Sequence, residues 1–377
     1  MIIGIDGNEA NVKNRVGVNK YAFEMIWGLY KLTSDSNSSH SLIVYLKNEP
    51  QKDLPKERQN FKYKVINGGG LWIITKLTPH LFRNPDKLQV LFSPSHYTPP
   101  LLTIPRVASI MDLGYLEFSE HFEKKVLWQL TCWSAISIFV SKRILTISDS
   151  SKKDIVRHYP FAAKKTVVTL LGFDKDKFNK APNLDDIRSI KKRYSIVSDY
   201  ILYIGTLKPS KNIGRLIESF ASLPLSQHSN LSLVIAGKKG WMYEDLYKKV
   251  KELNLQDRVV FTDFVSESDK AGLIAGAKVF VLPSLWEGFG LDVLSALALG
   301  IPAVVSTVGS LPEVAGKAGT YVDPYSIDSI AGGLIKVLNM SKSDYNKIVK
   351  LGYDQVKKFD WETCARKTLE VLENIND

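Results

Sequence analysis

Hydrophobic residues in the first half of the chain fall into short runs that alternate with segments of helical spacing. The runs are MIIGID, SLIVYL, VLFSP, RVASIMD and RILTIS, at residues 1–6, 41–46, 90–94, 106–112 and 143–148. Residues 18–32 (VNKYAFEMIWGLYKL) and 150–159 (SSKKDIVRHY) have the spacing of helices. Strands that alternate with helices predict parallel βαβ units.

The same pattern starts again after the polar stretch FDKDKFNKAPNLDD, residues 173–186, which is typical of a linker. Strand-like runs follow at residues 200–206, 231–237, 259–265, 278–284 and 301–307, with helical spacing at 213–223, 243–253 and 291–299. The pattern predicts an α/β fold of two Rossmann-like, doubly wound parallel-sheet domains facing a central cleft. Ligands in such sheets bind beyond the carboxyl ends of the strands.

Length and composition agree with this organisation. A chain of 377 residues is long enough for about two domains. With 45% hydrophobic and 24% charged residues it has the composition of a folded globular protein. The cysteines, Cys132 and Cys364, form no pairing or metal-ligand pattern, and the start MIIGIDGNEA does not resemble a signal peptide. We therefore expect a cytoplasmic protein.

The basic excess lies in the first half. Residues 1–180 contain 26 Lys and Arg against 16 Asp and Glu, whereas residues 181–377 contain 24 against 23. This asymmetry indicates that the first half faces an anionic partner, with ordinary solubilising charge as the alternative. Nucleic acid is not the expected partner, because the aromatic residues follow strand and helix patterns and form no stacking platform.

The stretch EGFGLDVLSALALG, residues 287–300, places an acid and two glycines between a buried strand and a helix. Glycines let the backbone approach a ligand closely, and the helix start offers unpaired N–H groups that suit a phosphate. Glu287 would repel phosphate, so it should face neutral hydroxyls. A phosphate beside hydroxyls describes a nucleotide-sugar, and a plain tight turn is the alternative.

A second strand, glycine loop and helix occur in YIGTLKPSKNIGRLIESF, residues 203–220. This loop contains Gly205, Thr206, Lys208 and Lys211. Two ammonium groups near a helix start are suited to hold a diphosphate and to offset the charge of a departing nucleotide.

Motifs in register along the chain resemble one known family. They are IGIDGNEA with GVNKYAFE, ILTISDSSKKDIVRHYP, LGFDKDKF, YIGTLKPSKN, LVIAGKKGWMYEDLY, VVFTDFVSESD, AGAKVFVLPSLWEGFGLDVLSALALGIPAVVS and GSLPEVAGKAGTYVDP. Together they resemble the retaining glycosyltransferases of GT-B architecture in family 4, also called group 1. The resemblance implies an amino-terminal acceptor-binding domain over residues 1–178, a nucleotide-sugar-binding domain over 179–355, and a last helix, 356–377, that returns to the first domain.

The resemblance also implies roles for individual residues on the donor side. Glu287 resembles the acid that contacts the hydroxyls of the donor sugar, and Lys211 the lysine that binds the diphosphate. Gly17 resembles a glycine loop that approaches the diphosphate from the other domain. The backbone beside the sugar corresponds to Gly288, Phe289, Gly290 and Leu291, and the loop near the base to Phe264 and Val265.

Three positions depart from the family pattern. Ser295 replaces a second glutamate that usually holds the ribose hydroxyls, Ser210 replaces a basic residue before the lysine, and Met111 stands where many relatives carry a histidine before Asp112. These departures leave donor affinity and nucleotide choice open. On the acceptor side, Asp112, Met111 and the loop histidine His96 are the candidates.

The resemblance implies transfer of a sugar from a UDP-, GDP- or ADP-sugar to a hydroxyl of a glycan or lipid-linked acceptor, with retention of configuration. Retaining members are thought to use the leaving phosphate as the base, so no protein nucleophile is needed. We expect no cofactor and no metal, although Asp174 and Asp176 have D-x-D spacing. The alternatives are a weak or inactive nucleotide-sugar-binding relative and an epimerase of the same architecture.

Two apolar runs in the basic half, residues 71–83 and 124–143, mix Trp, Leu, Ile and Phe with flanking Lys and Arg. This chemistry suits the anionic inner surface of a membrane and hence a peripheral membrane protein. The alternative is that the aromatic residues form the core of the acceptor domain, and for residues 124–143 we expect the core.

Overall fold

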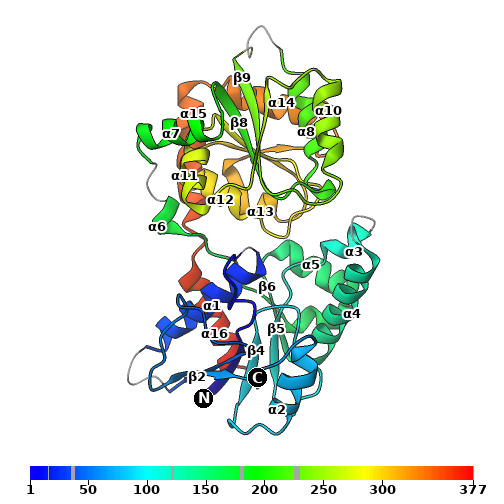
Figure 1. Cartoon of the computed structure of the whole chain (residues 1–377), viewed down its shortest axis with the longest axis vertical. Coiled ribbons are helices and arrows are strands. Elements are labelled where there is room, and N and C mark those ends of the chain that lie inside the picture. Colours follow the sequence, from blue (N-terminus) through cyan, green and yellow to red (C-terminus); the bar gives the residue numbers. More distant parts are fainter. Residues whose placement is uncertain (16, 35–38, 120–122, 179–181, 225–229, 377) are drawn as a thin grey trace. The chain divides into compact units, whose positions relative to one another are not determined.

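The computed structural model describes residues 1–15, 17–34, 39–119, 123–178, 182–224 and 230–376 (Figure 1). They form two compact units. Unit 1 contains Met1–Gly172 and Asp360–Asp377, and unit 2 contains Phe173–Phe359. The divisions fall at residues 172 and 359, whereas the sequence predicted boundaries after 178 and 355. Phe359 stays with unit 2 because its ring packs edge-to-face on Phe289, with 5.6 Å between the ring centroids.

Unit 1 is built on a seven-stranded parallel sheet with the strand order β3-β2-β1-β4-β5-β6-β7. Its strands are β1 (Ile2–Asp6), β2 (Ser41–Leu46), β3 (Phe61–Val65), β4 (Val90–Ser93), β5 (Arg106–Ser109), β6 (Arg143–Thr146) and β7 (Thr166–Val168). Its helices are α1 (Val18–Leu32), η1 (Ile73–Leu77), α2 (Thr78–Phe82), α3 (Gly114–Glu117), α4 (Lys124–Val140), α5 (Asp149–His158), η3 (Pro160–Lys165) and α16 (Trp361–Glu373).

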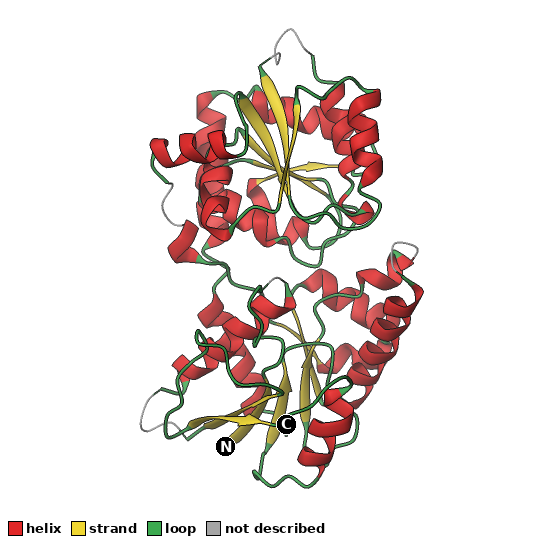
Figure 2. Ribbon diagram, viewed as in Figure 1, coloured by secondary structure: helices red, strands yellow, loops and turns green. Residues whose placement is uncertain are grey.

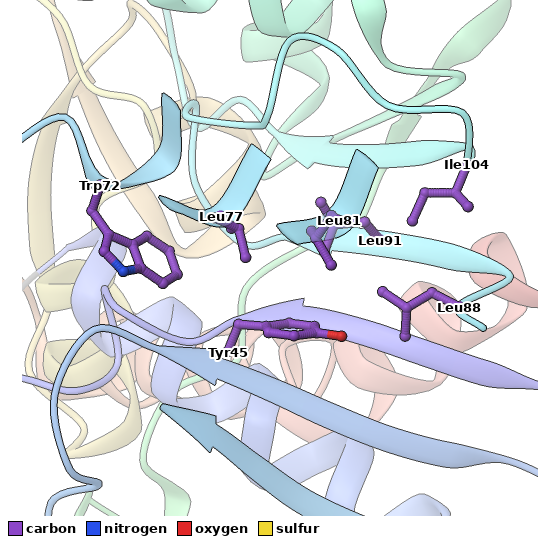
Figure 3. Packing of buried hydrophobic residues seen from close by; sticks show 7 residues of the cluster. All are labelled: Tyr45, Trp72, Leu77, Leu81, Leu88, Leu91 and Ile104. Atoms are coloured by element: carbon purple, nitrogen blue, oxygen red, sulfur yellow. The ribbon is translucent and has the colours of Figure 1, made fainter. Parts of the chain in front are cut away.

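Buried side chains join the sheet of unit 1 to its helices. Figure 3 shows one such cluster, in which Tyr45 of β2 lies below Leu77 and Leu81 of the η1–α2 segment. The Tyr45 hydroxyl leaves the cluster to donate to Asp86 Oδ2 at 2.8 Å. The remaining members are Trp72, Leu88, Leu91 and Ile104.

The terminal helix α16 packs on α1 inside unit 1. A Cβ placed on Gly28 of α1 would lie 2.4 Å from the Cβ of Ala365, so only glycine permits this approach. Cys364 lies beside it and is buried, with its Sγ 3.9 Å from Met25 Sδ. The last eighteen residues therefore complete the core of the unit that the first residues begin.

Unit 2 is built on a six-stranded parallel sheet with the strand order β10-β9-β8-β11-β12-β13. Its strands are β8 (Asp199–Ile204), β9 (Leu231–Ala236), β10 (Val259–Asp263), β11 (Val279–Leu282), β12 (Ala303–Ser306) and β13 (Gly319–Val322). Its helices are α6 (Lys175–Phe178), α7 (Leu184–Arg193), η4 (Pro209–Lys211), α8 (Ile213–Ala221), α10 (Glu244–Glu252), α11 (Glu267–Ala275), α12 (Leu291–Ala298), α13 (Leu311–Ala315), η5 (Gly316–Ala318), α14 (Ile327–Leu338) and α15 (Lys342–Val356).

Both units are doubly wound, and Figure 2 shows helices on the two sides of each sheet. In each sheet the strand order reverses once, between β1 and β4 in unit 1 and between β8 and β11 in unit 2. At such a point the connections leave toward opposite faces and open a crevice at the carboxyl ends of the strands. The fold thus marks one place in each unit where a ligand is expected.

Helix α4 corrects one prediction. Its run was expected to be core, yet only Ser134, Ser137 and Ile138 are fully buried, while the side chains of Trp128 and Phe139 are 69% and 74% exposed. Hydrophobic residues of α4 lie on its outer face as well as on the face that packs against the unit, so the run is not simply core.

Candidate functional site

The crevice of unit 2 lies between the loop that follows β8 and the loop that follows β11. The first loop contains Lys208 and Lys211 and leads into α8, and the second contains Glu287 and leads into α12. The sequence predicted both loops as ligand-binding. The strand order β8-β11 brings their starting points to adjacent strands.

Lys211 and Glu287 form a direct ion pair between these two loops, from Nζ to Oε2. Their side chains are only 15% and 14% exposed, so the pair is shielded from bulk water. Partial burial strengthens the attraction but also requires each charge to keep a partner. The residues that the sequence assigned to the sugar hydroxyls and to the diphosphate therefore occupy one site and neutralise each other.

Backbone contacts fix the lysine side of the site. The Leu285 N–H donates to the carbonyl of Ser210 at 2.9 Å and ties the two loops together. Asn212 follows Lys211 in the left-handed conformation, with φ of 60°, and is 5% exposed. Its amide donates to the carbonyls of Pro283 (2.9 Å) and Pro324 (2.6 Å), which leaves the turn that carries Lys211 little freedom.

The glutamate side is held by the loop after β12. The Ser310 hydroxyl donates to the carbonyls of Glu287 and Phe289, both at 2.9 Å. Gly309 has φ of +62°, and a Cβ there would lie 2.6 Å from the Glu287 carbonyl oxygen. Only glycine fits this position. The sequence analysis missed Gly309 and Ser310, although the GSLPEVAG motif contains both.

Helix α12 begins at the site without a side-chain cap among the described residues, and its N-cap is Gly290 with φ of 96°. The Val293 N–H donates to the Gly290 carbonyl at 3.0 Å, which leaves the backbone N–H groups of Leu291 and Asp292 without an acceptor inside the helix, and the helix dipole adds positive potential. An anion is thus favoured here. Gly288 is half-buried, whereas the Phe289 side chain is buried in the core and contributes to the loop through its backbone.

Ser295 lies on the buried side of α12. It is 3% exposed, and its hydroxyl donates to the Leu291 carbonyl one turn earlier, at 3.4 Å. The sequence proposed this serine as a substitute for a ribose-binding glutamate. In this conformation the hydroxyl bonds within its own helix, and the side chain offers little surface to a ligand.

The remaining predicted donor residues lie in the loops that follow β8 and β10. Gly205 and Thr206 follow β8 directly, and the ammonium group of Lys208 lies 5.5 Å from the ring centroid of Trp241. Phe264 is 65% exposed and Val265 half-buried at the end of β10, just before α11. β10 lies two strands from β8, and an exposed aromatic ring at its carboxyl end is suited to stack on a base.

A second ion pair, between Lys270 of α11 and Asp292 of α12, was not predicted. Burial lowers the pKa of Lys270, but the Asp292 carboxylate outweighs this effect and raises it above the usual value. The pair ties the first turn of α12 to the helix that follows Phe264. The spacing of the two residues in the sequence gives no signal of this contact.

In unit 1 the crevice contains a pocket of about 320 Å³ at the ends of β1 and β4. Its polar wall is formed by Asp6, Asn8 and Glu9. Its apolar wall includes Trp72, Tyr97 and Trp133, and the other lining residues are Lys47, Gly69, Gly70, Leu71, Ile73, Ser95 and Gln129. Aromatic walls with a few convergent polar groups are typical of small-molecule sites.

The two acids of this pocket hold their protons more tightly than usual. Burial raises the pKa of Asp6 to about 6, although the backbone and side-chain N–H groups of Asn8 donate to its Oδ1 at 3.1 and 2.8 Å. Burial also raises the pKa of Glu9, whose Oε2 accepts from Asn19 Nδ2 at 2.6 Å. Perturbed acids in a pocket mark a candidate site.

The acceptor-side residues predicted from sequence lie near this pocket without lining it. Burial lowers the pKa of His96, against the effect of Asp112, and the His96 ring packs edge-to-face on Tyr97 with centroids 4.7 Å apart. Asp112 accepts from the Gly114 N–H at 2.9 Å, and the Met111 carbonyl accepts from Thr146 at 3.5 Å. Gly17 caps α1 with φ of 52° and has open space around it.

The described residues contain neither a metal-binding cluster nor a membrane-spanning helix. Among them, no group of three or more His, Cys, Asp and Glu side chains is placed to hold a metal ion. The side chain of Asp176, half of the D-x-D pair, lies outside the described residues. Within the same part of the chain, every helix is too short or too polar to cross a membrane.

Comparison with known proteins finds a family match over part of the chain. Residues 187–355 match the family described as "Glycosyl transferases group 1". The O-antigen chain mannosyltransferase B of Escherichia coli is 33% identical over 235 residues, which cover 62% of this chain and 61% of that protein. The chain thus matches about three fifths of that relative's length.

Solved structures resemble the whole chain. Sucrose-phosphate synthase from Thermosynechococcus elongatus superposes with a TM-score of 0.74 at 17% identity, covering 99% of this chain and 98% of that one. HepE from Anabaena, solved in complex with UDP and glucose, gives 0.73 at 17%, covering 99% of both chains. The chain has the GT-B fold. The fold and the family match over residues 187–355 agree with the resemblance found in the motifs.

Proposed function

We propose that this protein is a retaining glycosyltransferase that moves a hexose from a nucleotide-sugar to a hydroxyl group of a glycan. The observation that carries the proposal is the Lys211–Glu287 pair beside the uncapped start of α12, at the point where the sheet of unit 2 reverses its order. An anion-binding helix start, a cation and a carboxylate side by side match a diphosphate linked to a sugar.

Donor binding exchanges one partner of the ion pair for another. The diphosphate contacts the N–H groups of the first turn of α12 and replaces the Glu287 carboxylate at the Lys211 ammonium group. Glu287 is then free to accept hydrogen bonds from the hydroxyls of the sugar. Before binding, the two charges pair with each other; after binding, the Lys211 ammonium group faces the diphosphate and the Glu287 carboxylate accepts from the sugar hydroxyls, so each charge keeps a partner.

The chemical step requires stabilisation of charge and no protein nucleophile. As the bond between sugar and phosphate breaks, negative charge grows on the diphosphate, where Lys211 and the helix start stabilise it. The leaving phosphate accepts the proton of the acceptor hydroxyl on the face that it leaves, which retains the configuration. We propose that these groups supply the positive charge without a metal cofactor, so activity should survive a chelator.

The acceptor is proposed to bind in the pocket of unit 1. A sugar ring has apolar C–H faces and a rim of hydroxyls, which suits the walls formed by Trp133 and Tyr97 and by Asp6 and Glu9. Mannose is the first sugar to test, because the E. coli relative is named a mannosyltransferase. That name also favours a polysaccharide acceptor.

A transfer assay with a panel of donors tests the proposal. UDP-, GDP- and ADP-linked hexoses are incubated with oligosaccharide acceptors, and both transfer and donor hydrolysis are measured. The proposal expects turnover with at least one donor and an α-linked product from an α-linked donor. Nucleotide binding without turnover for every pair would support an inactive relative, and interconversion of donor sugars would support an epimerase.

A further inference from the structure

Helix α4 of unit 1 has an outer face that is apolar although it is exposed. The buried side of the helix is the narrow stripe of Ser134, Ser137 and Ile138. Val126, Trp128, Ile136 and Phe139 are between 39% and 74% exposed. Large aromatic side chains in water on one helix face mark an interaction surface more often than isolated exposed residues do. Figure 1 shows α4 along the right-hand edge of unit 1.

Three of the exposed residues, Trp128, Ile136 and Phe139, lie in a stripe on one face of the helix because they are eight and three residues apart. The half-buried Cys132 lies on the same face between Trp128 and Ile136. Phe161, which is 57% exposed, extends the stripe beyond the helix end, since its ring centroid lies 6.2 Å from that of Phe139. Lys165 fixes this junction by donating to the carbonyls of Phe139 and Ser141 at 3.3 and 2.9 Å.

Cationic side chains stand at both ends of the stripe. Lys124 and Lys125 are exposed in the first turn of α4, and Lys142 and Lys164 are exposed near its end. Residues 124–165 contain nine Lys and Arg against two Asp. The helix dipole disfavours cations in a first turn, and α4 has no acidic residue there beyond its exposed N-cap Glu123. The dipole of α4 therefore does not favour Lys124 and Lys125, and their position suits an anionic partner.

We propose that this surface, the α4 face, binds an anionic lipid membrane. It is defined by Trp128, Ile136, Phe139 and Phe161 with Lys124, Lys125, Lys142 and Lys164. Aromatic residues insert at the boundary between headgroups and acyl chains, while lysines contact the lipid phosphates. Helix α4 has seventeen residues and four lysines near its ends, and none of the helices in the described residues can span a membrane. These properties fit a helix that lies on the membrane surface.

Membrane binding would also position the acceptor pocket. Gln129 and Trp133 of α4 line the pocket of unit 1, so the pocket adjoins the α4 face through one helix. An acceptor carried on a lipid would then reach the pocket without leaving the membrane surface. This consequence rests on the proposed function, whereas lipid binding itself does not.

Vesicle flotation of the full chain tests the proposal without an activity assay. Vesicles contain either phosphatidylcholine alone or phosphatidylcholine with about one third phosphatidylglycerol, at about 0.05 M and about 0.5 M salt. We expect at least tenfold stronger partition onto the anionic vesicles at low salt, and most of this preference should disappear at high salt. No difference between the two lipid compositions would overturn the proposal.

Matched variants locate the binding surface. The double variant W128A/F139A should reduce partition at least tenfold, and K124Q/K125Q should reduce it by about fivefold for each lysine. The control L184A/V197A changes two side chains of unit 2 that are 70% and 94% exposed, and it should bind vesicles like the wild type. Because all these side chains are exposed, the thermal unfolding midpoints should stay close to that of the wild type.

Two outcomes would contradict the α4 face as a lipid surface. One is unchanged vesicle binding by W128A/F139A. The other is a dimer, seen by light scattering, that this variant dissociates while vesicle binding remains, which would assign the face to contact between copies of the chain. If the protein does not bind vesicles but transfers sugar to a soluble acceptor, the proposed function stands without the membrane proposal. If it binds anionic vesicles but transfers no sugar, the membrane proposal stands without the proposed function.

Discussion

The two units share one sheet order but differ in what they place where that order reverses. Unit 2 has a shielded ion pair whose loops are fixed by backbone hydrogen bonds. Unit 1 has a pocket with aromatic walls and two acids whose pKa values burial raises. The first suits a charged diphosphate and the second a neutral polyol. The same scaffold therefore supports two kinds of recognition, and the loops decide which.

Removal of the cation from unit 2 should have the largest effect. K211A is expected to reduce the transfer rate by about 10²–10³-fold, because the leaving diphosphate loses a charged partner. K208A should cost less than about tenfold, since the Lys208 ammonium group lies over Trp241 instead of Glu287. Steady-state kinetics of both variants measure the difference. Equal losses would show that the two lysines act as one clamp.

Removal of the negative charge at position 287 should separate binding from transfer. E287Q is expected to bind free nucleoside diphosphate more tightly than the wild type, because Lys211 no longer has a competing carboxylate. Transfer should still fall by about 10–100-fold, since contacts to the sugar hydroxyls are lost. Calorimetry with the nucleoside diphosphate gives the first value and kinetics the second. Weaker nucleotide binding by E287Q would contradict the exchange of partners proposed above.

The pocket of unit 1 should respond differently. W133A is expected to raise KM for the acceptor about tenfold, which corresponds to roughly 1–2 kcal/mol of lost apolar contact, with kcat little changed. Nucleotide affinity should stay at the wild-type value because Trp133 belongs to unit 1. A change in nucleotide affinity with unchanged acceptor KM would remove this pocket from the proposed function.

The buried acid of unit 1 predicts a small dependence of stability on pH. The pKa of Asp6 is about 6 in the folded protein and 3.8 for an ordinary aspartate, so the folded state binds more protons between these values. The free energy of unfolding should therefore fall as the pH rises from about 4 to about 6. The variant D6N keeps a carbonyl oxygen that accepts from Asn8. Because its amide does not titrate, its free energy of unfolding should not fall for this reason.

The stability gain of D6N over the wild type should therefore increase across this pH range, by up to about 2–3 kcal/mol. Unfolding by urea at both ends of the range, followed by a probe in unit 1, measures it. A gain that does not change with pH would show that Asp6 is ionised at its ordinary pKa.

The central strands of both sheets could be predicted from sequence, but three edge strands could not. Buried parallel strands such as β9 have continuous apolar runs, and these stand out. The missed strands β3, β7 and β13 lie at sheet edges and are short or partly exposed. In β3, FKYKV, lysines alternate with aromatic residues because part of the strand faces water.

The charged residues of the site followed from loops between strands and helices, but their contacts did not. Glycines and lysines after a strand end predict an anion site, whereas the direct pairing of Lys211 with Glu287 depends on how two loops fold against each other. The roles of Gly309 and Ser310 also depend on three-dimensional contacts with a distant segment. The prediction that residues 124–143 form core was wrong for a related reason. An apolar run does not show which side of its helix faces water.

The return of α16 to unit 1 dictates an order of events during synthesis. Residues 173–359 leave the ribosome before the segment that covers Met25 and Gly28 of α1. Residues 1–172 therefore lack part of their core until residues 360–377 are made, whereas unit 2 can already fold. Deletion of residues 360–377 should thus damage the beginning of the chain and spare its middle.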